Sequence, residues 1–186
     1  SEIELIAQAK ASGLPVTCEV TPHHLFLTDA DAARLGTYGE VRPALGSVED
    51  QEALWQHLNS TIDCIASDHA PHTREEKEQP EGSPPGVPGL ESTLPLMLTA
   101  AAQGRLTYAR LIELLSTNPR QIFNLPEQAD TYVEIDPAAT YTFPDHPLYT
   151  KCGWSPFTGM LMTGRVQRVV LRGQEVVRDG IVLNYR

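Results

Sequence analysis

Ile62-Asp63-Cys64-Ile65-Ala66-Ser67-Asp68-His69-Ala70-Pro71-His72 joins a short apolar run to a dense group of polar side chains. Residues 62–66 are mostly apolar, which is typical of a buried strand in a parallel sheet. The polar group follows directly where that strand ends. Because catalytic side chains of α/β barrels lie at the C-terminal ends of the strands, this stretch predicts an α/β fold with a site centred on Asp68.

Helices and strands alternate on both sides of this stretch. An amphipathic helix at the start of the chain stops at Gly13, and Ser47 with Asp50 resembles a capping box. We expect helices at about 1–12, 47–58, 91–103 and 108–115, and strands at 14–20 and 62–66. This alternation favours a (β/α) barrel or a doubly wound sheet.

The pattern becomes mostly β beyond about residue 125. Strands are expected at 132–135 and 167–171, with turns at Arg172-Gly173 and Asp179-Gly180. We therefore divide the chain into an α/β part at 1–127 and a small β-rich part at 128–186. Before this boundary, residues 79–89 form a Pro- and Gly-rich loop, and a long loop of this kind is often a lid or a binding loop.

Composition limits the partners of the chain. The net charge of −10 and the scattering of its 14 Lys and Arg residues leave no basic face for nucleic acid. No apolar stretch approaches the ~20 residues that span a bilayer, and no signal peptide is evident, so we expect a soluble, cytoplasmic protein. Cys18, Cys64 and Cys152 are few and far apart, which indicates reduced thiols rather than disulfides or a zinc ribbon.

Three groups of residues could carry chemistry, and their spacing leaves alternatives open. Asp68 suits metal binding or proton transfer, but it could equally cap the next helix. His23 and His24 would point to opposite faces of a strand, so at most one would face a site; metal ligation and simple packing both remain open. The planar guanidinium of Arg42 suits a substrate carboxylate, although it could form a surface salt bridge.

Several motifs taken together resemble dihydroorotases of the amidohydrolase superfamily. The motifs are Cys18-Glu19-Val20-Thr21-Pro22-His23-His24-Leu25, Val41-Arg42-Pro43, the stretch 62–72, Glu75-Glu76-Lys77, residues 85–91 and Asn118-Pro119-Arg120. Their order and separations match as well. The resemblance covers nearly the whole chain and is strongest to the class that includes the dihydroorotase domain of animal multifunctional pyrimidine enzymes.

The resemblance implies a fold and a reaction. Residues 1–127 would be the C-terminal part of a TIM-like (β/α)8 metallo-dependent hydrolase barrel, and residues 128–186 part of a small β-sandwich domain. The family interconverts dihydroorotate and N-carbamoyl-L-aspartate in pyrimidine biosynthesis with two zinc ions. A homo-oligomer or a complex with other enzymes of that pathway is expected.

The resemblance also implies roles for individual residues. Asp68 would bind one metal and move the proton, Arg42 and His72 would hold the substrate carboxylate, and Pro85 and Gly86 would contact the ring. His23, His24 and His69 are interpreted as supporting residues, and Glu19 matches a position that contacts an additional metal in some members. The other expected ligands, a His-x-His motif and a Lys or Asp bridge among them, would precede Ser1, so the chain alone is expected to bind zinc weakly and to be inactive.

Two competing interpretations remain. Another cyclic amidohydrolase, such as allantoinase or dihydropyrimidinase, would give Arg42 and His72 no carboxylate to bind, and a buried unpaired guanidinium is costly. A non-catalytic scaffold related to dihydroorotase would not need the set Asp68, Arg42 and His72. The sequence does not determine the metal count, the bridging ligand, the oligomeric state or whether the parent is one enzyme or a multifunctional chain.

Overall fold

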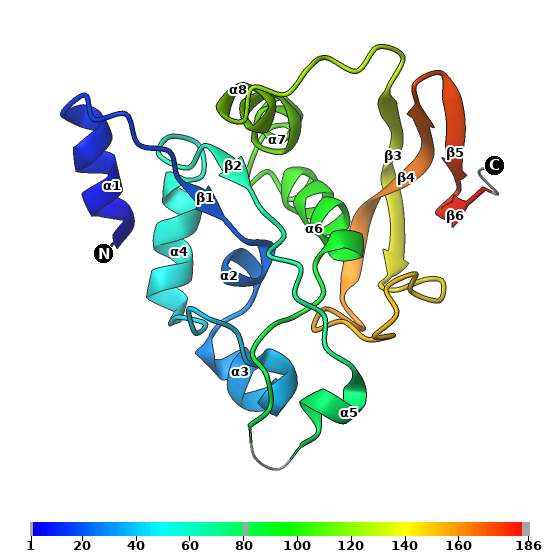
Figure 1. The fold of residues 1–186 in the computed structure, drawn as a ribbon, viewed down its shortest axis with the longest axis horizontal. Helices are drawn as coiled ribbons and strands as arrows, with labels where there is room; N and C mark the ends of the chain where they lie inside the picture. The colour runs from blue at the N-terminus through cyan, green and yellow to red at the C-terminus, as the bar shows by residue number, and fades with distance from the viewer. Residues whose placement is uncertain (1, 80–81, 184–186) are drawn as a thin grey trace.

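A computed structural model describes residues 2–79 and 82–183 (Figure 1). The helices are α1 (Glu2–Ala11), α2 (Pro22–Phe26), α3 (Asp29–Leu35), α4 (Val48–His57), α5 (Arg74–Lys77), α6 (Leu90–Ala102), α7 (Tyr108–Ile112) and α8 (Asn118–Ile122), with a 3₁₀ helix at Gly36–Gly39 and a π-helix at Glu113–Thr117. The strands are β1 (Glu19–Val20), β2 (Cys64–Ile65), β3 (Tyr132–Thr142), β4 (Leu161–Leu171), β5 (Gln174–Arg178) and β6 (Ile181–Val182). The chain is therefore an α/β protein.

Strands β1 and β2 form a parallel pair, as the apolar run at 62–66 predicted. Glu19 pairs with Cys64 and Val20 with Ile65. The first strand is shorter than expected, because residues 14–17 have no strand partner within the described chain and lie exposed. Parallel pairing brings the C-terminal ends of both strands to the same edge, where the Asp68 and His23 segments begin.

The long helices follow the sequence expectations closely. The Ser47 hydroxyl accepts a hydrogen bond from the amide of Asp50, and the Asp50 carboxylate accepts one from the amide of Ser47, which is the predicted capping box of α4. The helix expected at 108–115 instead changes at Glu113 into a π-helical turn. The short helices α2, α3, α5 and α8 were not expected, because each is too short to show a helical period.

The second half of the chain carries an antiparallel sheet in the order β3-β4-β5-β6. Both predicted turns connect its strands, with φ of +51° and +78° at Arg172 and Gly173, and +49° and +79° at Asp179 and Gly180. Positive φ at both central residues is the geometry of a type I′ hairpin turn. Strands β3 and β4 are longer than expected, and their register shifts between Asp136 and Thr140.

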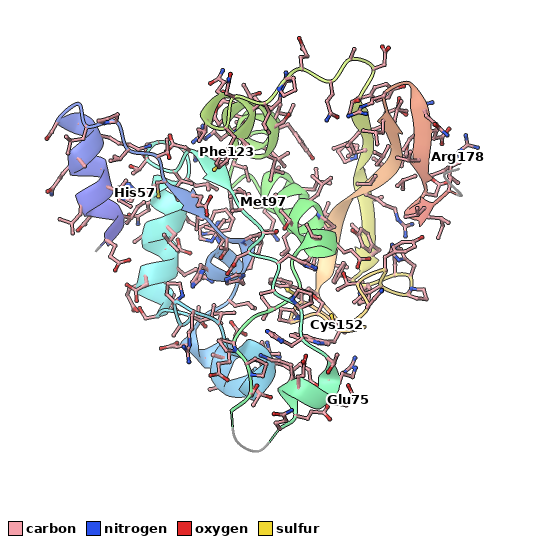
Figure 2. The ribbon with its side chains drawn as sticks, in the orientation of Figure 1. His57, Glu75, Met97, Phe123, Cys152 and Arg178 are labelled. Atoms are coloured by element: carbon pink, nitrogen blue, oxygen red, sulfur yellow. The ribbon has the colours of Figure 1, made fainter. Side chains whose placement is uncertain are left out.

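Helix α6 lies between the parallel pair and the antiparallel sheet (Figure 1). Met97, fully buried near the centre of the molecule in Figure 2, belongs to a core cluster with residues of α2, α4, β1 and β2. A second cluster joins Leu96 and Val87 to Met162 and Phe157. The antiparallel strands begin at Tyr132, and this hydrophobic packing joins residues on both sides of the proposed boundary at 127/128. No described helix is long and apolar enough to cross a membrane.

Candidate active site

The site begins where the parallel strands end. The amide of Ala66 donates to the carbonyl of Val20 at 3.0 Å, which extends the contact beyond the paired residues. Two residues further on, Asp68 adopts a φ of +44°, an uncommon conformation for a residue other than glycine that asparagine and aspartate tolerate best. Its carboxylate Oδ2 lies 4.0 Å from His23 Nε2. A carboxylate from one strand end and an imidazole from the other therefore face each other.

The local structure at His23 differs from the sequence expectation. His23 lies in helix α2, which begins with Pro22 after the N-cap Thr21, so the two adjacent histidines are not in a strand. Its side chain is 2% exposed, and its buried Nε2 has no hydrogen-bond partner. Burial, with a smaller contribution from the neighbouring His24, lowers the pKa of His23 to about 4. The imidazole is therefore neutral near pH 7, which is the form that binds a metal.

The His23 and Asp68 pair fits two ligands of one zinc ion. Zinc binds histidine nitrogen and carboxylate oxygen at roughly 2.0–2.2 Å, so two ligands of one ion lie about 3–4 Å apart. The Asp68 side chain is 55% exposed and can approach a metal from the open side. Within residues 2–79 and 82–183, however, no group of three His, Cys, Asp or Glu side chains could hold a metal ion. The described residues thus offer a histidine nitrogen and a carboxylate with the spacing that two zinc ligands have, and not a complete metal site.

His24 and His69 contact other residues of the protein through their ring nitrogens. His24 Nδ1 lies 2.7 Å from the Thr21 hydroxyl, and its Nε2 lies 3.1 Å from the carbonyl oxygen of Pro43. His69 Nδ1 accepts hydrogen bonds from the amides of Gly89 at 3.0 Å and Leu90 at 3.3 Å. His24 therefore ties α2 to the Arg42-Pro43 segment, and His69 ties the strand end to the start of α6.

Arg42 and His72 remain accessible. Arg42 is exposed and forms no ion pair with any described residue, so the surface salt bridge considered from the sequence is not observed. The side chain of His72 is 29% exposed, and its Nδ1 lies 3.5 Å from the Glu76 carboxylate. Both side chains are thus able to meet a ligand from solvent.

The Pro85-Gly86 turn packs against the segment that carries His72. Gly86 has a φ of +136°, and a Cβ at this position would lie 2.6 Å from the carbonyl oxygen of Ala70 and 3.4 Å from His72 Cδ2. Only glycine fits this close approach without movement. The amide of Gly86 donates to the carbonyl of Glu40 at 2.8 Å, and the amide of Ala70 donates to that of Val87 at 3.1 Å. The expected lid region is therefore anchored beside the candidate site.

Glu19, Cys18 and Cys64 lie at or beside the two parallel strands and have less defined roles. Glu19 is exposed at the start of β1. All three cysteines are free, as expected. Burial raises the pKa values of Cys18 and Cys64, so both thiols stay protonated near neutral pH and are poor metal ligands in that form.

Comparisons with known proteins bear on this arrangement. No family model matches the chain. It is 52% identical over 183 residues to multifunctional protein pyr1-3 of Dictyostelium discoideum and 51% identical over 183 residues to multifunctional protein CAD of Squalus acanthias, covering 98% of this chain and 8% of each relative. It is 41% identical over 165 residues to a dihydroorotase of Halobacterium salinarum, covering 84% of this chain and 39% of that enzyme.

Solved structures similar to this chain include a dihydroorotase-like domain and a hydantoinase. The inactive dihydroorotase-like domain of a CAD-like multifunctional protein of Chaetomium thermophilum matches with a TM-score of 0.78 and 34% identity, over 98% of this chain and 50% of that one. L-Hydantoinase (dihydropyrimidinase) of Arthrobacter aurescens matches with a TM-score of 0.88 and 33% identity, over 98% of this chain and 44% of that one. The chain thus spans half or less of each relative.

These structural matches show that the chain is similar in fold to part of the cyclic amidohydrolases. In sequence, the chain is similar over 98% of its length to the two multifunctional proteins and over 84% to the dihydroorotase. The resemblance indicated by the motifs is thereby confirmed.

Proposed function

We propose that this chain is the C-terminal portion of a zinc-dependent dihydroorotase, which interconverts dihydroorotate and N-carbamoyl-L-aspartate in pyrimidine biosynthesis. Residues 1–127 would complete a TIM-like barrel with further strands, and residues 128–186 would contribute to a small β-sandwich domain. The observation that carries the proposal is the convergence of Asp68 and the unpartnered His23 Nε2, 4.0 Å apart at the ends of two parallel strands.

The chemistry would divide between metal and protein. Bound zinc lowers the pKa of water towards ~7 and polarises a carbonyl group. Asp68 and His23 would each hold zinc, and the remaining ligands would come from outside the described residues. In hydrolysis, the Asp68 carboxylate would accept the proton of the attacking water and return it to the ring nitrogen as the amide C–N bond breaks. The exposed Asp68 side chain would serve both the attacking water and the ring nitrogen.

The substrate would be held by its carboxylate and its ring. Arg42 and His72 would bind the carboxylate, since the Arg42 guanidinium has no ion-pair partner among the described residues. Pro85 and Gly86 would contact the pyrimidine ring. The Gly86 amide and carbonyl already bind Glu40 and Lys77, whereas the Pro85 carbonyl accepts no hydrogen bond from a described residue, which makes that carbonyl the favoured backbone contact.

Two other functions have specific support. Similarity to L-hydantoinase favours a cyclic amidohydrolase with a different ring substrate, and similarity to an inactive dihydroorotase-like domain favours a scaffold in a pyrimidine-enzyme assembly. Both are weaker candidates, because the accessible Arg42 suits a substrate with a carboxylate and the buried His23 nitrogen suits a metal.

Turnover by a polypeptide that joins this chain to the rest of the barrel would test the proposal. We expect hydrolysis of dihydroorotate in preference to hydantoin, dihydrouracil and allantoin. Asp68→Asn should lower kcat roughly 10²–10⁴-fold by removing the proton carrier, while Arg42→Gln should mainly raise KM. The matched control is Asp29→Asn, an exposed change on α3. A preference for hydantoin or dihydrouracil, or complete inactivity of the zinc-loaded polypeptide, would overturn the assignment.

A further inference from the structure

Lys77 is the most unusual charged residue outside the metal-binding pair. It closes the four-residue helix α5 and is 0% exposed. Its ammonium forms no ion pair with a described carboxylate. Burial lowers the pKa of Lys77, and the negative charge of Glu40 opposes that shift without forming a direct ion pair. A buried ammonium with no direct ion pair is costly, so hydrogen bonds must compensate it.

Lys77 is compensated by the loop that lies over it. Its Nζ donates to the carbonyl of Pro84 at 2.8 Å and to that of Gly86 at 3.3 Å. These two carbonyls flank Pro85. The Nζ also lies 5.9 Å from the centre of the Trp154 ring, within the range of a cation–π contact. One buried cation therefore holds both sides of the turn that is proposed to contact substrate.

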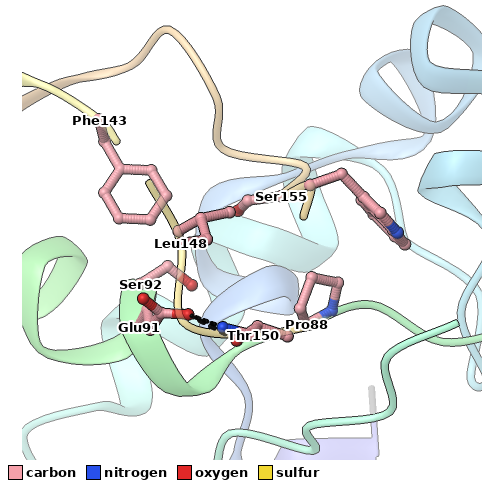
Figure 3. A pocket seen from close by; sticks show the side chains of 8 residues that line it. Pro88, Glu91, Ser92, Phe143, Leu148, Thr150 and Ser155 are labelled. Carbon is pink, nitrogen blue, oxygen red and sulfur yellow. Dashed lines mark hydrogen bonds between the residues drawn. The ribbon is translucent and has the colours of Figure 1, made fainter. Parts of the chain in front are cut away.

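Trp154 connects the same contact to His72. Its indole Nε1 donates to the backbone carbonyl of His72 at 2.8 Å, and the residue is 4% exposed. The loop that carries Trp154 is held against α6, because the Glu91 carboxylate accepts a hydrogen bond from the amide of Tyr149 and another from the amide of Thr150. Figure 3 shows Glu91 beside Thr150. Lys77 and Trp154 thus link the Pro84–Gly86 backbone to the backbone of His72.

We propose that Lys77 is a positioning residue that holds the Pro85-Gly86 turn at a fixed distance from His72 and so determines how tightly a ring substrate with a carboxylate is bound. The role rests on the proposed function, since it assigns substrate contacts to both sides of this arrangement. In this role Lys77 does not touch the reacting atoms. A residue that only filled space here would need no charge, and an apolar side chain would avoid the cost of burying an ammonium.

The first test is hydrogen–deuterium exchange of the 186-residue chain. Lys77→Met keeps most of the side-chain volume and removes the three donors. We expect exchange of the amides in 82–89, including the bonded Gly86 amide, to rise at least 10-fold while α4 and α6 stay protected. Lys10→Met is the matched control, because Lys10 also donates to a backbone carbonyl, that of Thr61, far from the loop. An equal effect of both variants on 82–89, or no change in Lys77→Met, would overturn the proposal.

The second test separates this inference from the proposed function. In the polypeptide joined to the rest of the barrel, Lys77→Met should raise KM for dihydroorotate about 10-fold and change kcat less than 3-fold. Lys77→Arg, which keeps a cation and hydrogen-bond donors, should raise KM less than Lys77→Met does. If the parent polypeptide turns over no dihydroorotate, the proposed function fails while the exchange result still decides the role of Lys77. If it is active and Lys77→Met leaves KM unchanged, Lys77 has no positioning role.

Should Lys77→Met fail to fold, Trp154→Phe offers an independent variant. It keeps an aromatic ring near the ammonium and removes only the hydrogen bond to the His72 carbonyl. The same increase in KM, with kcat nearly unchanged, is expected because His72 loses its support. An unaltered KM in this variant would contradict the proposed link between Trp154 and His72.

Discussion

At the scale of single residues, the glycine at position 86 is required by contact as well as by conformation. Gly86→Ala would place a Cβ 2.6 Å from the Ala70 carbonyl oxygen at a φ of +136°. We expect a loss of roughly 1–3 kcal/mol in the free energy of unfolding, because the backbone of the loop or of Ala70 must move. Urea denaturation followed by tryptophan fluorescence would measure it.

Gly104→Ala is the control for this substitution. Gly104 has a φ of +76°, but nothing lies within 4 Å of its added Cβ. Gly104→Ala should lower the free energy of unfolding less than Gly86→Ala does, since only the conformational cost of positive φ applies. Equal losses at the two positions would show that the close approach to Ala70 has no energetic consequence.

The position of Asp68 at the end of a strand could be predicted from the sequence, whereas the position of His23 could not. Asp68 follows an apolar run that is readily recognised as a buried strand, and its place at the strand end follows from that. The orientation of His23 depends on the short helix α2, which begins at Pro22 and leaves no periodic pattern over its five residues. The proximity of His23 and Asp68 joins residues 45 positions apart through the β1–β2 pairing, and no local signal encodes it.

At the scale of elements, Glu91 fastens the segment before Trp154 to the start of α6. Its carboxylate accepts hydrogen bonds from the Tyr149 amide at 2.9 Å, the Thr150 amide at 2.7 Å and the Thr150 hydroxyl at 2.6 Å. Burial by itself would raise the pKa of Glu91, but these hydrogen bonds outweigh burial and lower it. The folded protein therefore prefers the ionised carboxylate.

Glu91→Gln should lower the free energy of unfolding at pH 7 by roughly 1.5–3 kcal/mol, the range for hydrogen bonds to a charged group. Because the folded pKa lies below the ordinary value of about 4.3, the stabilisation is fully present above that value and is lost as pH falls through the folded pKa. The difference between the parent and Glu91→Gln should therefore be constant near pH 6–8 and shrink below about pH 4.

Chemical denaturation across this pH range would check that expectation, with Glu52→Gln as control. Glu52 makes one exposed ion pair with Arg105 at 2.8 Å, which should contribute no more than about 1 kcal/mol. A difference between the parent and Glu91→Gln that is the same at pH 3.5 and pH 7 would show that the ionised carboxylate is not the source of the stabilisation.

Elements were predictable where their signals are local. The Ser47 capping box, the amphipathic start of the chain and the two type I′ turns each depend on neighbouring residues, and the structure contains all of them. The short first strand could not be delimited, because the extent of a strand depends on its partner. The π-helical turn at Glu113–Thr117 likewise has no recognised local pattern.

At the scale of the whole molecule, the proposed division at 127/128 separates two kinds of sheet but not two hydrophobic interiors. Leu96 and Val87 pack with Met162 and Phe157 in one cluster, and the Trp154 indole reaches the His72 carbonyl. The β-rich segment therefore supports the candidate site directly. Sequence patterns show where the strand type changes, but contacts between distant segments depend on the packing of the complete chain.

The last prediction concerns the proposed metal site in the isolated 186-residue chain. In the proposed function His23 and Asp68, 4.0 Å apart, would provide two ligands, whereas a zinc site in a protein commonly has three or four protein ligands. At pH 7 the His23 imidazole is neutral, since its pKa is about 4, so protonation does not oppose binding. We expect the 186-residue chain to bind zinc more weakly than about 1 µM and to hydrolyse no dihydroorotate, because too few ligands hold the ion.

Calorimetric titration with zinc, together with a dihydroorotate assay at saturating zinc, would measure both properties. His23→Gln and Asp68→Asn should each weaken the residual zinc binding further, while Asp29→Asn, an exposed change on α3, should leave it unaltered. Zinc binding that survives both site variants would place the metal elsewhere on the chain. Turnover by the isolated chain at an ordinary enzymatic rate, about 1–10³ s⁻¹, would mean that residues of this chain alone complete the catalytic site.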